Sequence, residues 1–180
     1  MMQRFSPQHL ALYEAHYATH APRERPHRWQ SLVEHLAQGL GATSILDYGC
    51  GQAANLARFS ALPIVSYDPS IPAYAQEPES ADLVICMHML EHVEPEYITA
   101  VLLHLWSLAR LAVLITVSCQ ASTKRLPDGT PWHSFLKPPS WWADRLAVLA
   151  MPGMCEALPV ERPAVEYGCL LTRSAPAATL

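Results

Sequence analysis

The sequence predicts an α/β fold: a doubly wound, mostly parallel sheet of about six strands that ends in an antiparallel strand pair. Three observations support this prediction. Short apolar runs alternate with helical segments along most of the chain, and such alternation implies parallel strands joined by right-handed crossovers. The first strand-like run ends in a glycine turn. The last two runs are joined at Glu161-Arg162-Pro163, a connection typical of antiparallel neighbours.

Two helices are expected before the first strand. Ser6-Pro7 places a proline at the first position of a helix spanning residues 5–20. A basic linker broken by prolines (APRERPHR) follows it. The second helix covers residues 28–39 and ends at Gly39 and Gly41; its apolar face is formed by Trp29, Leu32, Val33, Leu36 and Leu40.

The remaining elements alternate along the chain. The next strands are expected at residues 44–48, 63–67, 82–87 and 112–118. Helices are expected at residues 52–60, 95–110 and 138–149. The proline-rich stretch 69–81 and the polar stretch 119–137 are predicted to be loops. We therefore divide the chain into an N-terminal helical lead-in (1–43), one main domain (44–173) and a flexible tail (174–180).

The composition excludes several classes of protein. With 180 residues, 51% of them hydrophobic, the chain can bury one core but not two. The five cysteines are odd in number and form no CxxC pair, which argues against a disulfide framework or a zinc site and favours a reducing, cytoplasmic setting. The net charge of −4 makes a nucleic-acid partner unexpected. No apolar run suits a signal peptide or a membrane span, so no membrane partner is expected. We expect a monomer or a homodimer.

A glycine loop follows the first predicted strand, in the segment Asp47-Tyr48-Gly49-Cys50-Gly51. Gly49 and Gly51 let the backbone turn sharply and approach a ligand, to which the next helix would present free N–H groups. By itself this pattern also fits an ordinary strand-to-helix turn. Its position favours a binding loop, because open parallel sheets bind ligands at the carboxyl ends of their strands.

Asp68 ends the second predicted strand. An acidic residue there can accept hydrogen bonds from ribose hydroxyls, or it can cap a turn. Together with the glycine loop it indicates a nucleoside ligand, either a nicotinamide dinucleotide or S-adenosylmethionine (SAM). A dinucleotide site needs a third glycine, where this chain has Ala54. The carboxylate of Asp47 would repel a pyrophosphate but suits the ammonium and sulfonium groups of SAM, so a nicotinamide oxidoreductase is the weaker alternative.

At these motifs the chain resembles the class I SAM-dependent methyltransferases, from about Ile45 to Ser118. ILDYGCG matches their first motif, VSYDP their second-strand motif, ADLVICMHMLEHV their fourth-strand motif, and LARLAVLITVS the segment leading into the fifth strand. The resemblance implies a Rossmann-like fold, SAM as cofactor, and methyl transfer to an O or N atom of a small-molecule acceptor. It also implies three groups of cofactor contacts: Asp47, Gly49, Cys50 and Gly51 at the methionine part, Asp68, Pro69 and Ser70 at the ribose, and Cys86, Met87 and His88 at the sulfonium.

Two departures from the family pattern are visible. Ala53 replaces the third glycine of the first motif, which is a small change. The stretch from Asp68 to Asp82 is too short for the helix and strand that family members usually have there, and the end of that strand helps to bind adenine. We therefore expect adenine to be held by other residues, such as Ile71, Pro72 and Tyr74. The shortening also keeps open the alternative of a non-catalytic partner subunit that binds SAM or a nucleoside.

Three titratable residues, His88, Glu91 and His92, follow the third predicted strand. His88 and His92 would share a helical face, but a metal site needs a third nearby ligand, so no metal is expected. A neutral His88 near the methyl group could accept a proton from an acceptor hydroxyl or amine; His133 is the second candidate for this catalytic base. His92 is expected to make a structural hydrogen bond near the glycine loop.

The loop between the fifth-strand-like segment and the last helix should hang over the mouth of the site. Trp132 and His133 in this loop are therefore candidate substrate contacts. Trp141 and Trp142, which follow it, are expected to pack in the core.

The N-terminal segment supplies the other candidate substrate contacts. Arg25 and Arg28 suit a phosphate or carboxylate on an anionic acceptor, or they belong to a solvated face. Tyr17 is a further candidate, although its helical spacing also fits a core position.

Overall fold

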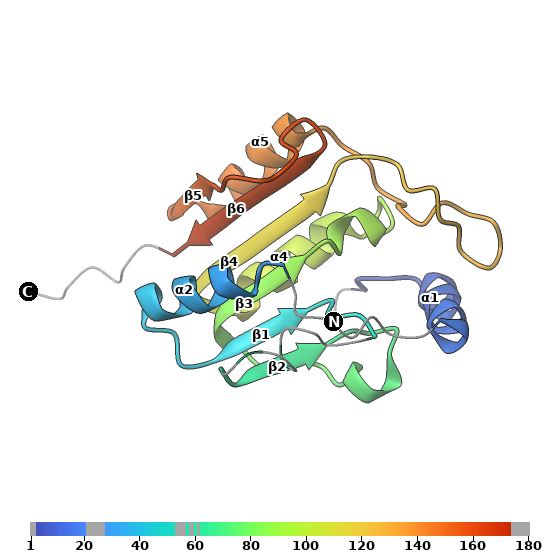
Figure 1. Ribbon diagram of the computed structural model, residues 1–180, viewed down its shortest axis with the longest axis horizontal. Coiled ribbons are helices and arrows are strands. Elements are labelled where there is room, and N and C mark those ends of the chain that lie inside the picture. Colours follow the sequence, from blue (N-terminus) through green and yellow to red (C-terminus); the bar gives the residue numbers. More distant parts are fainter. Residues whose placement is uncertain (1–2, 21–27, 53–56, 58–59, 61, 174–180) are drawn as a thin grey trace, which may run out of the picture.

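One sheet forms the centre of the molecule (Figure 1). The structure is a computed structural model that describes residues 3–20, 28–52, 57, 60 and 62–173. Within these residues the strands are β1 (Ile45–Tyr48), β2 (Ile64–Tyr67), β3 (Ala81–Met87), β4 (Ala109–Ser118), β5 (Met154–Ala157) and β6 (Glu166–Thr172). They lie in the order β2-β1-β3-β4-β6-β5. β2, β1, β3 and β4 are parallel to one another, whereas β6 is antiparallel to β4 and β5, which confirms the predicted α/β fold.

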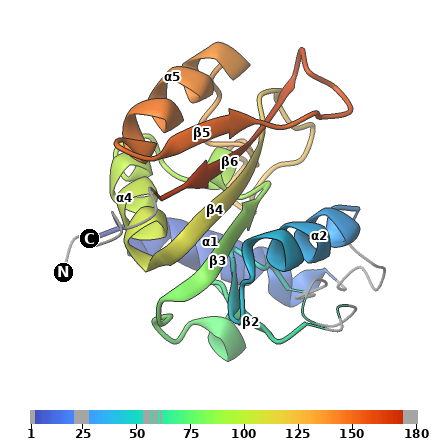
Figure 2. The same ribbon diagram turned by 90° about the vertical axis from the view of Figure 1, so that its left-hand side faces the viewer.

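Helices cover both faces of the sheet. Those described are α1 (Pro7–Thr19), α2 (Gln30–Leu40), α4 (Ile98–Leu108) and α5 (Pro139–Ala150), with short 3₁₀ turns η1 (Pro72–Tyr74) and η2 (Leu90–His92). α2 lies on one face, and α4 and α5 lie on the other (Figure 2). α1 lies off the faces, beyond the carboxyl ends of β1 and β2 (Figure 1). None of the described helices is both long and apolar enough to cross a membrane.

Local sequence signals explain where the first two helices begin and end. At the start of α1, Ser6 Oγ accepts a hydrogen bond from the backbone N–H of His9, and Pro7 takes the first helical position. Gly41 ends α2 in the left-handed conformation at φ +65°, whereas Gly39 lies inside the helix. Most of the helix predicted over 52–60, and the whole tail 174–180, lie outside the described residues.

The predicted helix over 95–110 was wrong at both ends. The helix begins only at Ile98, and β4 starts directly after it at Ala109. Sheet pairing explains the second boundary, because Ala109 pairs with Ala81 of β3. Arg110 donates hydrogen bonds from Nε to Asp82 Oδ1 (2.7 Å) and from Nη1 to the carbonyl of Ser80 (2.6 Å), which ties it to the start of β3. Tertiary contacts therefore overrule helix propensity at these two residues.

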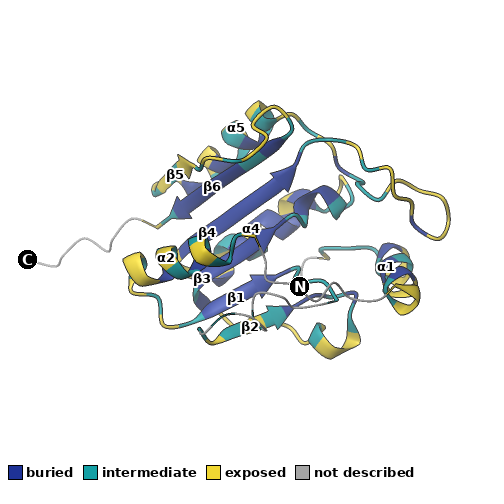
Figure 3. Cartoon of the chain, viewed as in Figure 1, coloured by how far each residue is buried: buried dark blue, intermediate teal, exposed yellow. Residues whose placement is uncertain are grey.

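The central strands of the sheet are more buried than its edge strand β2 (Figure 3). The central strands β1, β3 and β4 are almost wholly buried, while β2 is an edge strand whose Val65 is 63% exposed. One apolar cluster fills the space between the sheet and α4 and α5, where Trp142 is fully buried as predicted. A second cluster lies between the sheet and α2. The predicted loop 69–81 contains η1 and ends at Ala81, which is already the first residue of β3, so no α-helix covers β2 from this connection.

Candidate active site

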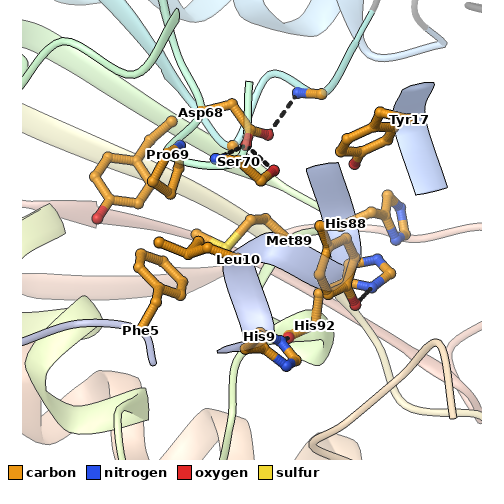
Figure 4. Close-up of a pocket in the computed structure, with 14 residues that line it drawn as sticks. Phe5, His9, Leu10, Tyr17, Asp68, Pro69, Ser70, His88, Met89 and His92 are labelled. Carbon is orange, nitrogen blue, oxygen red and sulfur yellow. Dashed lines mark hydrogen bonds between the residues drawn. The ribbon is translucent and has the colours of Figure 1, made fainter. Parts of the chain in front are cut away.

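A cavity of about 160 Å³ lies at the carboxyl ends of β1, β2 and β3, where open parallel sheets bind ligands. Four residues of α1 also line it, namely His9, Leu10, Tyr13 and Tyr17, together with Phe5. Phe5 and His9 lie on the side of the cavity away from Asp68 (Figure 4). The sheet side of the lining includes many of the residues predicted from sequence. These are Gly49, Gly51, Asp68, Pro69, Ser70 and His88, and they are joined by the predicted Tyr17 from α1.

The glycine loop has the backbone conformation for which the sequence selects glycine. Gly49 and Gly51 have φ angles of +81° and +63°, which side-chain-bearing residues rarely adopt. A Cβ atom on Gly49 would also clash with the side chain of Met89. The backbone N–H groups of Gly49 and Cys50 donate to the carbonyl of Tyr67, at 2.7 and 3.1 Å. The loop is therefore held against the end of β2.

Asp68 connects the end of β2 to the glycine loop. Its Oδ2 accepts a hydrogen bond from the backbone N–H of Gly51 (3.0 Å), and its Oδ1 accepts from the backbone N–H (3.0 Å) and hydroxyl (2.6 Å) of Ser70. The backbone N–H of Asp68 donates to the carbonyl of Tyr74 in η1. Burial raises the pKa of Asp68, against the lowering effect of these hydrogen bonds.

Asp47 is 5% exposed and lies directly before the loop. Burial, followed by the nearby charge of Asp68, raises its pKa to about 7. Neither Asp47 nor Asp68 forms an ion pair with any residue that the structure describes. Asp47, a buried acid without a cation beside a glycine loop, fits the ammonium and sulfonium groups of SAM, which would supply the missing positive charge.

The other predicted cofactor residues lie beside the cavity rather than in its lining. Cys86 is fully buried in the cluster under α4, and Met87 is 7% exposed in the cluster under α2. Cys50 is half-buried. The residues proposed for adenine, Ile71, Pro72 and Tyr74, are likewise not among those that line the cavity, so the adenine contacts stay a prediction.

His88 lies between two buried carboxylates. Its backbone is strained at φ +53°. Its Nδ1 is 3.3 Å from Glu91 Oε1, and its Nε2 is 3.0 Å from Glu166 Oε1. Both glutamates are 1% exposed. Burial alone would raise the pKa of Glu91, but the hydrogen bond with His88 and the charge of His92 lower it.

Glu166 is a site residue that sequence reasoning missed. It is the first residue of β6 and pairs in register with Ser118, the last residue of β4. This antiparallel pairing brings it back to the carboxyl ends of the parallel strands, next to His88. The only signal in the sequence is an acidic residue at the start of an apolar run.

Arg28 is held by this group of carboxylates. Its Nη2 donates to Glu166 Oε1 and lies 2.7 Å from His88 Nε2, while its Nη1 donates to Glu161 at 3.1 Å. The arginine that sequence assigned to an anionic acceptor is thus already paired with two carboxylates. Arg25 lies outside the described residues.

Trp132 packs against α1 and is not among the residues that line the cavity. Its ring lies 4.9 Å from that of Tyr13 and 4.4 Å from that of His16, and its carbonyl accepts a hydrogen bond from the Tyr13 hydroxyl at 2.8 Å. His92 Nδ1 lies 2.9 Å from the same carbonyl, and burial lowers the pKa of His92. His92 therefore joins α1 to the long loop, whereas we expected its hydrogen bond near the glycine loop.

Comparisons with known proteins identify the family of the chain. A family model described as a methyltransferase domain matches residues 21–150. No protein of curated function matches the chain by sequence. Among solved structures, the methyltransferase domain of bacterial CtHen1 is 13% identical, with a TM-score of 0.59 over 81% of this chain and 97% of that one. A complex of DhpI with SAM and HEP is 17% identical, with a TM-score of 0.58 over 91% and 94%.

A third similar structure is the 1,6-didemethyltoxoflavin-N1-methyltransferase of Burkholderia thailandensis, with bound 1,6-didemethyltoxoflavin and S-adenosylhomocysteine. It is 16% identical, with a TM-score of 0.53 over 82% of this chain and 78% of that one. At these identities the structural matches show the fold, and the family model covers more than half of the chain. The chain therefore belongs to the class I SAM-dependent methyltransferases.

Proposed function

We propose that the protein transfers the methyl group of SAM to an O or N atom of a small molecule. Bound SAM supplies an electrophilic methyl group on a sulfonium sulfur. One observation carries the proposal: the glycine loop, Asp68 and His88 all line one cavity. Asp47 and the loop backbone would hold the methionine part and Asp68 the ribose, so that the reactive end points toward His88. Once Arg28 moves away from His88 Nε2 toward the acceptor, this nitrogen would take the proton of the acceptor as it is methylated.

An anionic acceptor, such as a phosphate or a carboxylate, remains part of the proposal. To bind an anionic acceptor, Arg28 would have to release Glu161, whose side chain is 72% exposed. Exposed ion pairs contribute little free energy, so this exchange costs about 0–1 kcal/mol. Screening small alcohols, amines and acids for formation of S-adenosylhomocysteine tests the acceptor class directly.

The role of His88 as the base gives a prediction about turnover. With an acceptor identified by that screen, His88→Ala should lower kcat by about 10²- to 10⁴-fold and leave the Kd for SAM within a few-fold of wild type. His35→Ala, on the exposed face of α2, is the control and should change neither quantity. Equal losses of SAM affinity and turnover in His88→Ala would contradict the assignment of His88 as the base.

The raised pKa of Asp47 gives a second prediction. Without ligand, folded Asp47 holds its proton up to about pH 7, whereas the unfolded carboxyl titrates near 3.8, so the free energy of unfolding should fall as pH rises through this window. A cation beside Asp47 favours the carboxylate, so SAM binding at pH 6–7 should release a proton. Calorimetry in buffers of different ionisation enthalpy measures this release, which Asp47→Asn should abolish. If Asp47→Asn releases as many protons on binding SAM as the wild type does, the proton comes from a group other than Asp47.

A further inference from the structure

Glu91, His92 and His133 form a cluster at one end of the cavity. One potential ligand atom of each residue lies within 4.8 Å of the other two. Glu91 and His92 belong to η2, whereas His133 comes from the long loop that follows β4. His92 lines the cavity on the side opposite Asp68 (Figure 4). The folded chain therefore brings His133 to Glu91 and His92 as a third potential ligand, which the local sequence pattern lacks.

Hydrogen bonds define which ring nitrogen of each histidine is free. His92 Nδ1 is 2.9 Å from the carbonyl of Trp132, and His133 Nδ1 is 2.7 Å from the carbonyl of Gln120. A carbonyl oxygen can only accept. The Tyr13 hydroxyl is also 3.0 Å from His92 Nδ1, but it donates its proton to the Trp132 carbonyl, so both neighbours of His92 Nδ1 are acceptors. We therefore assign the proton of each ring to Nδ1. In a neutral ring Nε2 then has a free lone pair. Histidines that bind metals share this arrangement, in which the second nitrogen donates to a carbonyl or a carboxylate.

Glu91 contributes an oxygen without a partner. Its Oε1 lies near His88 Nδ1 and accepts a hydrogen bond from the backbone N–H of Ser118 (3.2 Å). Its Oε2 is buried and has no hydrogen-bond partner among the described residues. A buried carboxylate oxygen without a donor is costly, and no histidine Nε2 with a free lone pair can supply one. A cation bound by one atom of each residue would neutralise this buried carboxylate.

We propose that Glu91, His92 and His133 bind a divalent transition-metal ion. Two imidazole nitrogens and one carboxylate form the donor set that suits ions such as Zn²⁺, Fe²⁺ and Co²⁺. Three protein ligands leave coordination positions open. Because His92 lines the cavity, these positions could take an oxygen or nitrogen atom of the acceptor.

The experiment uses the full chain after removal of metals with a chelator, and Co²⁺ as the probe in the absence of SAM and acceptor. We expect saturable binding of one Co²⁺ with visible ligand-field absorption, and displacement by Zn²⁺. His133→Gln should weaken binding by more than the roughly 10- to 100-fold that loss of an outer hydrogen-bond partner costs. His35→Gln is the matched control, because His35 is an exposed histidine of α2. This variant should bind Co²⁺ as the wild type does.

Glu91→Gln provides a second test that does not depend on the loop, and it should also lose the site. Thermal unfolding of each variant shows whether it is folded. The proposal is overturned if wild type shows no saturable Co²⁺ binding, or if folded His133→Gln and Glu91→Gln bind Co²⁺ with wild-type affinity. Since neither SAM nor acceptor is present, failure here leaves the proposed methyl transfer untouched.

Discussion

Asp68→Ala is expected to weaken SAM binding by about 10- to 100-fold. Hydrogen bonds to a charged group contribute about 1.5–3 kcal/mol, which corresponds to this change in Kd. The carboxylate has two tasks here, because it would accept from the ribose hydroxyls and it also accepts from the backbone of Gly51. Its removal therefore takes away a ligand contact and loosens the glycine loop. Calorimetry with SAM and S-adenosylhomocysteine measures the loss.

The chain offers a matched control for this variant. Asp128 accepts hydrogen bonds from the backbone N–H (2.9 Å) and hydroxyl (2.7 Å) of Thr130, the same local pattern that Asp68 makes with Ser70. It lies in an exposed turn of the long loop. Asp128→Ala should lose the local turn contacts and keep SAM affinity. Wild-type affinity in Asp68→Ala would overturn the ribose assignment.

Gly49→Ala should cause the largest loss of stability among the variants considered. The left-handed conformation at φ +81° costs an alanine about 1–2 kcal/mol, and the new Cβ also meets the side chain of Met89, whose own Cβ would lie at 2.8 Å. Forcing such a contact apart costs about a further 1–3 kcal/mol. For a chain of this size, the sum corresponds to a decrease in Tm of about 5–15 °C. Thermal unfolding followed by circular dichroism measures it, and SAM affinity should fall as well.

Gly129→Ala separates the two contributions. Gly129 has a φ of +87°, but an added Cβ would have no atom within 4 Å. This variant should therefore show only the cost of the backbone conformation, with unchanged SAM affinity. If Gly49→Ala lowers Tm by no more than Gly129→Ala, the contact with Met89 contributes nothing.

Most of the strands and the glycine loop could be predicted because their signals are local. Apolar runs mark β1 and β3, and Gly49 and Gly51 occupy the positive-φ positions that the turn requires. Ser6-Pro7 marks the start of α1 in the same way. In each case a few consecutive residues contain the physical reason for the structure.

The missed features depend on residues that meet only in the folded chain. Glu166 reaches His88 because β6 runs antiparallel to β4, and no nearby residue signals that register. His133 approaches Glu91 and His92 from the long loop, in which the neighbouring Trp132 packs on α1. Arg28 was expected either to bind an anionic acceptor or to belong to a solvated face, but it pairs with Glu166 and Glu161. Neither the hydrophobic periodicity of the sequence nor the spacing of its motifs indicates which distant residues will pair in this way.

The position of α1 makes the closure of the cavity independent of the apolar core of the sheet. α1 supplies His9, Leu10, Tyr13 and Tyr17 to the wall of the cavity, yet no α1 residue belongs to either apolar cluster of the sheet. Removal of α1 is therefore expected to leave the two apolar clusters in place and to open one wall of the cavity. For anyone preparing this protein, a good circular dichroism spectrum is thus no evidence of an intact pocket. The integrity of the first twenty residues has to be checked by mass.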